Sequence, residues 1–139
     1  MRTIKFRGKR IDNGEWVYGY FVGTTDSVAI IIPFEKVNYD VGYIGDSECC
    51  YCFPETIGQF TGLLDKNGKE IYEGDIVREK LKRTRKDGEK LFVCFEEFEW
   101  KGKNANGATT SLSLIAEYHT IELIGNIHDT PELLKGGKE

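Results

Sequence analysis

The sequence predicts a mainly β protein with little helix, and three observations support this. Glycine is frequent, with 16 residues, and proline is rare, with 3, which suits a chain with many β-turns. Aromatic and β-branched residues, which favour sheet, are frequent. Residues 54–77 run as a strand, a tight turn, a short strand and a Gly-Asp corner that leads into another strand. Short strands joined by such turns specify a small β-barrel.

The N-terminal part of the chain predicts a hairpin followed by a buried strand. Residues 2–7 alternate polar and apolar side chains, the period of a half-buried strand. Asp-Asn-Gly at 12–14 tolerates positive φ and predicts the turn, with residues 15–21 as the return strand. Residues 29–32 form a short apolar strand, and we expect a loop-rich excursion over residues 33–53. Three aromatic residues share one face of the return strand: Trp16, Tyr18 and Tyr20.

After residue 53 the signals for strands and turns become more regular. Asp-Lys-Asn-Gly at 65–68 predicts a hairpin turn. At the next corner Gly74 permits a bend and Asp75 can accept bonds from backbone N–H groups, an arrangement that opens many SH3-like barrels. A strand follows over residues 75–82, and Arg-Lys-Asp-Gly at 85–88 predicts a second hairpin tip.

The C-terminal part continues the β pattern. Residues 91–100 are expected to form the partner strand of the second hairpin, and residues 101–110 a polar turn or loop. Residues 111–123 predict one bent strand or two. Residues 130–134 have a candidate N-cap followed by proline, which predicts a single helical turn. Residues 136–139 should fray.

Two organisations fit these elements. We predict an N-terminal β-module with an irregular loop region over residues 1–53, an SH3-like barrel over 54–130, and a short helical turn with a flexible tail over 131–139. The alternative is one compact domain whose N-terminal half is irregular.

Charge and composition narrow the function classes. The chain has 139 residues and a net charge of −4, which gives no global attraction to nucleic acid. We expect no signal peptide, because no apolar segment follows the basic N-terminus, and no membrane span, because no apolar run is long enough. These features predict a cytoplasmic protein with its four cysteines reduced.

The sequence resembles the YopX-like proteins of phages and prophages. The resemblance implies a phage-encoded protein with an SH3-like roll and a tendency to oligomerise. It implies no enzymatic activity and no catalytic residue. The family motif includes neither the region between Arg78 and Ser111 nor the cysteines at 49–52. The resemblance rests on residues 4–10 (IKFRGKR) with 14–19 (GEWVYG), residues 55–77, and residues 124–128 (IGNIH) with 131–134 (PELL).

The cysteine cluster at 49–52 contains a C-x-x-C spacing. It could form half of a zinc site that Cys94, His119 or His128 completes, or a redox dithiol. A second C-x-x-C is missing, however, and no helix N-terminus is evident that would lower a thiol pKa. We therefore interpret the cysteines as small apolar side chains and expect neither a bound metal nor a cofactor.

Residues 62–69 superficially resemble a phosphate-binding loop. The spacing is wrong by one residue, and Glu70 stands where a serine or threonine must reach magnesium. We interpret this segment as a hairpin.

The stretch from residue 78 to 90 concentrates positive charge. A basic hairpin there could bind nucleic-acid phosphates. Glutamates at 96, 97 and 99 follow on the expected partner strand, and cross-strand ion pairs with them would neutralise much of the charge. The candidate nucleic-acid-binding residues are Arg78, Lys80, Lys82, Arg83, Arg85 and Lys86.

These patterns favour a non-enzymatic protein-interaction or assembly module. Its expected partners are a second copy of the chain, since unprotected sheet edges invite pairing, and a phage or host protein. A nucleic-acid-binding accessory protein is the alternative, followed by an enzyme. No membrane partner is expected.

Overall fold

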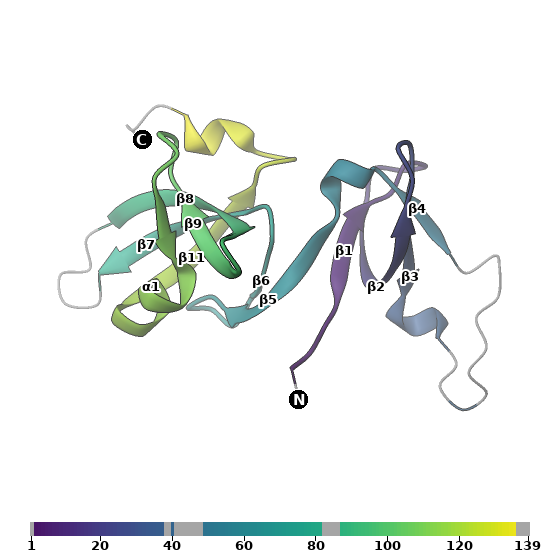
Figure 1. Cartoon of the computed structure of the whole chain (residues 1–139), viewed down its shortest axis with the longest axis horizontal. Helices are drawn as coiled ribbons and strands as arrows, with labels where there is room; N and C mark the ends of the chain where they lie inside the picture. Colours follow the sequence, from purple (N-terminus) through teal and green to yellow (C-terminus); the bar gives the residue numbers. More distant parts are fainter. Residues whose placement is uncertain (1, 38–39, 41–48, 82–86, 136–139) are drawn as a thin grey trace. The chain divides into compact units, whose positions relative to one another are not determined.

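The computed structural model describes residues 2–37, 40, 49–81 and 87–135 (Figure 1). Within them the fold is mainly β, with two antiparallel sheets and one α-helix, which confirms the predicted fold class. The chain divides into two compact units, Met1–Phe60 and Thr61–Glu139.

A six-stranded sheet has the order β4-β3-β2-β1-β5-β6. The 3-10 turn η1 (Phe34–Lys36) follows β3, and η3 (Pro54–Thr56) follows β4. The division between the two units falls within β5, whereas the sequence places its change in character at residue 53. The strands are β1 (Phe6–Lys9), β2 (Trp16–Thr24), β3 (Ala29–Pro33), β4 (Cys50–Cys52), β5 (Gly58–Leu64) and β6 (Glu70–Tyr72).

The first hairpin forms as the Asp-Asn-Gly signal predicts. Gly14 has a φ of 71°, and the Arg10 N–H donates to the Glu15 carbonyl at 2.8 Å. The strand predicted at residues 29–32 is also confirmed as β3, which pairs with β2. One face of this sheet forms the core of the first unit: Ala29, Ile31 and Cys52 are buried there against Phe6, Val17, Phe21 and Ile57.

This sheet also closes on itself at one end. β4 pairs with β3 along one edge. On its other edge the Ile11 N–H donates to the Tyr51 carbonyl and the Phe53 N–H donates to the Lys9 carbonyl, both at 2.9 Å. An antiparallel bridge joins Arg10 to Cys52 between these two bonds. The end of β1 and the residues after it therefore cover the edge that β4 would otherwise expose.

The second unit contains a five-stranded antiparallel sheet with the order β10-β9-β8-β7-β11. The helix α1 (Leu112–Tyr118) connects β10 to β11, and the 3-10 turn η4 (Pro131–Leu134) follows β11. Closure of this sheet into the predicted SH3-like barrel stays a prediction. The strands are β7 (Asp75–Leu81), β8 (Asp87–Glu96), β9 (Glu99–Lys103), β10 (Thr109–Ser111) and β11 (His119–Asn126).

Two aspartates organise the turns that the sequence predicts in this unit. Asp65 Oδ1 accepts bonds from the N–H groups of Asn67 and Lys69, and Oδ2 accepts one from Leu123 on β11 at 3.1 Å. The hairpin interpretation of residues 62–69 is thus confirmed. At the next corner Gly74 has a φ of 91°, and Asp75 accepts a bond from the N–H of Tyr72, as predicted.

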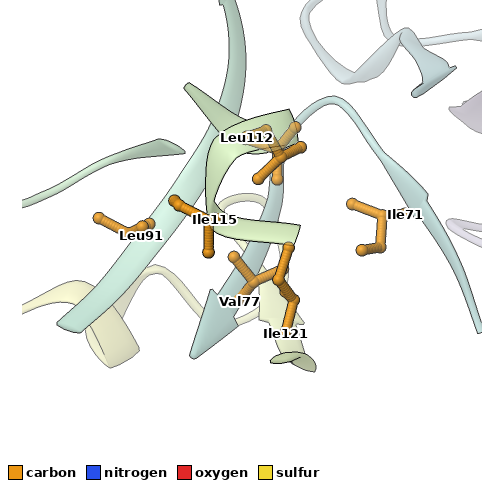
Figure 2. Close-up of a cluster of buried hydrophobic side chains, with 7 residues drawn as sticks. Ile71, Val77, Leu91, Leu112, Ile115 and Ile121 are labelled. Carbon is orange, nitrogen blue, oxygen red and sulfur yellow. The ribbon is translucent and has the colours of Figure 1, made fainter. Parts of the chain in front are cut away.

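The core of the second unit lies between this sheet and α1. Figure 2 shows Leu112 and Ile115 of the helix gathered with Val77 and Ile121 of the neighbouring strands β7 and β11. Leu112 is 0% exposed and Ile115 3% exposed. The full buried cluster is Ile71, Val77, Leu91, Val93, Leu112, Ile115 and Ile121.

The expectation of a strand or strands over residues 111–123 is therefore wrong for its first half, which forms α1. Leu112, Ile115 and Ala116 have helical spacing, and all three pack into the core cluster. The helical turn expected near residue 130 is confirmed as η4. Its Thr130 hydroxyl makes no capping bond and instead donates to the Asn126 carbonyl.

The expectation of one strand over residues 91–100 is also wrong. The chain reverses between β8 and β9 at Glu97 and Phe98, which have φ values of 52° and 66°. Both residues lie in the left-handed region, where hairpin turns usually place asparagine and glycine. The residue types at positions 97 and 98 therefore do not predict a reversal of the chain.

Candidate interaction surfaces

One face of the first unit combines a row of cations with a row of aromatic rings. Across the β1–β2 pair, Arg7 lies opposite Tyr18 and Lys9 lies opposite Trp16. Directly opposed residues of antiparallel strands project from the same side of the sheet. We call this surface the β1–β2 face and define it by Lys5, Arg7, Lys9, Trp16, Tyr18 and Tyr20.

Several cations on this face lie against rings. The Arg7 guanidinium carbon is 4.6 Å from the centre of the Trp16 ring, and Lys9 Nζ is 5.9 Å from it. Lys5 Nζ lies 4.8 Å above the Phe60 ring. These cation–π contacts fix the position of Trp16, while Tyr18 keeps 42% of its surface exposed.

Tyr20 extends the aromatic row and is also held from the side. Its ring meets Phe34 of η1 edge to face, with 4.9 Å between the ring centres, and 38% of its surface remains exposed. Two partly exposed tyrosines thus follow a fixed tryptophan along β2.

A cavity of about 450 Å³ adjoins the cysteine cluster within the same unit. Arg10 borders it and binds Asp12 through a 2.7 Å ion pair. Two cations, Arg10 and Lys36, and two acids, Glu15 and Glu35, line the cavity, so its walls carry mixed charge. Its lining residues are Arg10, Glu15, Trp16, Val17, Pro33, Glu35, Lys36, Cys49 and Cys50.

Burial raises the pKa of three cysteine thiols, those of Cys50, Cys52 and Cys94. The pKa of Cys52 rises to about 11, and that of Cys50 is also raised, mainly through desolvation. The same cause raises the pKa of Cys94. Because the thiolate is the nucleophile and the metal ligand, these shifts oppose the redox-dithiol interpretation at neutral pH.

The zinc hypothesis needs ligands from both units. Cys94 lies on β8, and His128 lies beside Gly74, both in the second unit. Among the residues that the structure describes, no three histidine, cysteine or acidic side chains come together as a metal site.

The structure describes only part of the predicted basic hairpin. Arg78 and Lys80 lie on β7, whereas Lys82, Arg83, Arg85 and Lys86 fall outside the described residues. Lys80 Nζ lies 3.5 Å from a Glu122 carboxylate oxygen on β11, and Lys66 Nζ lies 2.8 Å from the same oxygen. The bond from Lys66 lowers the pKa of Glu122, so this carboxylate offsets part of the positive charge.

The glutamates expected to neutralise the basic hairpin have other partners. Glu96 binds Lys103, and Glu97 binds Lys101 at 3.0 Å. Glu99 also lies 3.8 Å from Lys101. The expected cross-strand pairing is wrong in its partners, because the reversal at residues 97–98 brings β9, and not β7, alongside these acids.

That reversal creates a further surface, which we call the β8–β9 tip and define by Phe95, Glu97, Phe98 and Trp100. Phe98 is 98% exposed, and Phe95 is 50% exposed. The Phe95 and Trp100 rings meet edge to face with 5.0 Å between their centres. The sequence offers one signal for this tip, a dense aromatic run from residue 92 to 100, but no turn signature.

No described helix is long and apolar enough to cross a membrane. No curated protein matches the chain. Among solved structures, protein EF1440 from Enterococcus faecalis has a similar fold, with a TM-score of 0.54 and 20% sequence identity over 97% of this chain and 100% of that one. The family model described as YopX protein matches residues 5–135, so the chain belongs to the YopX family.

Proposed function

We propose that this YopX-family chain is a non-enzymatic protein-interaction module that self-associates through its β8–β9 tip. The YopX resemblance supports a phage or prophage origin and a second copy of the chain as the first partner. We further propose action in the cytoplasm of the host cell and a phage or host protein as a further partner.

The conformation of the tip carries this proposal. Glu97 and Phe98 both hold a left-handed conformation, which costs roughly 1–2 kcal/mol for each non-glycine residue. Phe98 regains none of this cost by burial, because 98% of its surface is exposed. A strained turn that presents a large apolar side chain to solvent is typical of an interaction anchor.

The base of the tip holds this anchor in place. Lys101 is 10% exposed at its side chain and binds Glu97 at 3.0 Å, which ties the first turn residue to β9. The Phe95 and Trp100 rings, with 5.0 Å between their centres, form an apolar pair on the strands that lead into and out of the turn. Rigid aromatic groups lose little conformational entropy on binding, so they supply affinity efficiently.

Burial raises the pKa of Cys50, Cys52 and Cys94, which disfavours the thiolate form of these three cysteines at neutral pH and so is in keeping with a non-enzymatic role.

Light scattering after size exclusion tests the proposal. We expect the wild-type chain to form oligomers whose mass falls on dilution, and Phe98→Ser to shift the protein to monomer. Leu114→Ser is the matched control, because it removes another apolar residue that is 50% exposed in the same unit. A wild-type chain that stays monomeric up to its solubility limit would refute self-association, and equal effects of both variants would refute the tip as its site.

A nucleic-acid-binding role for the hairpin over residues 78–90 is the second candidate. The register places Arg78 opposite Lys90, so two cations adjoin across β7 and β8. Reversal of Arg83, Arg85 and Lys86 to glutamate should then abolish a gel shift at low salt. If wild-type and reversed chains shift DNA and RNA equally, this hairpin is not the binding site.

A further inference from the structure

We propose that the β1–β2 face binds single-stranded nucleic acid without sequence preference. This site lies in the first unit and involves none of the residues of the β8–β9 tip or of the basic hairpin. It therefore goes beyond the proposed function and beyond its alternative.

The aromatic row has the geometry of a stacking platform. Trp16, Tyr18 and Tyr20 are alternate residues of one strand, so successive rings are about 6.6–6.8 Å apart along β2. That spacing suits successive bases of an extended strand, which stack on aromatic side chains whatever their identity. Tyr18 and Tyr20 are 42% and 38% exposed, and so offer surface to incoming bases.

The cationic row lies alongside the aromatic one. Arg7 and Lys9 on β1 oppose Tyr18 and Trp16, so the positive charges follow the direction of the ring row. Arg7 is only 5% exposed, and its guanidinium carbon lies over the Trp16 ring at 4.6 Å from the ring centre. Lys5 and Lys9 are more exposed and can reach phosphates of a strand whose bases lie over β2.

The same arrangement disfavours a duplex. In a duplex the bases are paired and stacked, so exposed tyrosines have no base face to contact. The residues that define the face, three cations and three aromatics, supply phosphate contacts and stacking surfaces, and neither of these depends on base identity. Binding should accordingly be sensitive to salt and tolerant of sequence.

Fluorescence anisotropy with labelled dT and rU oligomers tests the site. Oligomers of about twelve nucleotides fall within the site sizes of roughly 4–16 nucleotides seen for single-strand-binding folds. We expect Tyr18→Ala with Tyr20→Ala to weaken binding at least about fivefold, the loss that corresponds to one stacked base. Lys5→Glu with Lys9→Glu should also weaken binding and should flatten its dependence on salt between about 50 and about 200 mM.

Matched controls come from the same unit. Tyr51→Ala removes a tyrosine of β4 that is 55% exposed, and Lys36→Glu reverses an exposed lysine of η1, so neither should alter binding. Circular dichroism of every variant checks that the sheet is retained, and a face variant that loses the sheet is replaced by Tyr18→Ser alone.

Three results would overturn the inference. One is the absence of an anisotropy change at tens of micromolar protein in low salt. Another is loss of binding on reversal of Arg83, Arg85 and Lys86 with no effect of the face variants, which would move the site to the basic hairpin. The third is equal competition by polyglutamate at matched charge, which would identify the face as a site for an acidic protein.

Discussion

Asp65 shows how one side chain can hold together segments that lie far apart in the chain. Its carboxylate accepts N–H bonds from its own turn and from Leu123, which lies 58 residues further along the chain. Burial alone would raise the pKa of Asp65, but the N–H donors of Leu123, Lys69 and Asn67 outweigh it and lower the pKa. The turn and β11 are therefore held by the same charge.

Removal of that charge should destabilise the protein strongly. We expect Asp65→Ala to lower the free energy of unfolding by about 2–4 kcal/mol, because three backbone N–H groups lose the charged acceptor that a buried aspartate supplies. Urea denaturation at neutral pH measures the change. Asp12→Ala is the control, since it removes an aspartate with a 65% exposed side chain and should have little effect. Equal losses in the two variants would contradict this role of Asp65.

The stability contributed by Asp65 should also depend on pH. Its pKa in the folded state lies below the ordinary value of 3.8, so the folded protein binds fewer protons than the unfolded chain near that value. The contribution is then present above pH 3.8 and is lost as the pH falls through the lower folded pKa. In urea titrations, the difference between wild type and Asp65→Ala should shrink below pH 3.8 and stay constant above neutrality. A difference that grows on acidification would contradict this assignment.

In the β8–β9 tip, by contrast, Glu97 and Phe98 adopt a backbone conformation that neither residue type favours. We expect Phe98→Gly to raise the free energy of unfolding by about 1–2 kcal/mol, because glycine adopts positive φ without strain and the Glu97–Lys101 ion pair is kept. The same variant should lose self-association. Urea denaturation at low protein concentration and light scattering measure the two effects separately. A destabilised variant would show that the turn is not strained.

At the level of elements, the turns coded by glycine were predictable and the others were not. Gly14, Gly68 and Gly74 all have positive φ, and each lies in a turn or corner that the sequence predicts. The reversal at Glu97 and Phe98 was not predictable, because neither residue type favours that conformation. The ion-pair partners of Glu96, Glu97 and Glu99 therefore also differ from those that the sequence predicts.

The sequence does not clearly indicate helix α1, because residues 112–116 fit both the strand and the helix period. Leu112 and Leu114 alternate with serines as in a strand, whereas Leu112, Ile115 and Ala116 follow helical spacing. Packing decides between them, since Leu112 and Ile115 enter the core and Leu114 remains 50% exposed. Both patterns are present in the sequence, and periodicity alone does not decide between helix and strand here, because the choice depends on the core against which the segment packs.

The helix provides a direct test of this packing. Ile115→Ala should lower the free energy of unfolding by about 2–5 kcal/mol, because it leaves a cavity among buried side chains (Figure 2). Leu114→Ala, one position earlier, should change it little. A strand with Leu112 and Leu114 on its buried face would predict the reverse, a larger loss of stability for Leu114→Ala than for Ile115→Ala. Thermal or urea unfolding of the two variants distinguishes the helix from the strand.

At the scale of the whole molecule, the sequence predicts which residue types form the candidate sites but not which residues the fold brings together. The sequence puts Trp16, Tyr18 and Tyr20 on one face, yet the cations beside them depend on the register of β1 with β2. A net charge of −4 hides this local basic row, because composition averages over both units.

Self-association should couple the stability of the whole molecule to its concentration. Binding to the folded chain alone adds about 2.7 kcal/mol at a partner concentration of 100 times Kd. For a chain of 139 residues this should raise Tm by several degrees between dilute and concentrated samples. Phe98→Ser should have a Tm that does not change with concentration, whereas Leu114→Ser should follow the wild type. Differential scanning fluorimetry over two decades of concentration measures this, and a wild-type Tm that is constant across that range would argue against assembly through the tip.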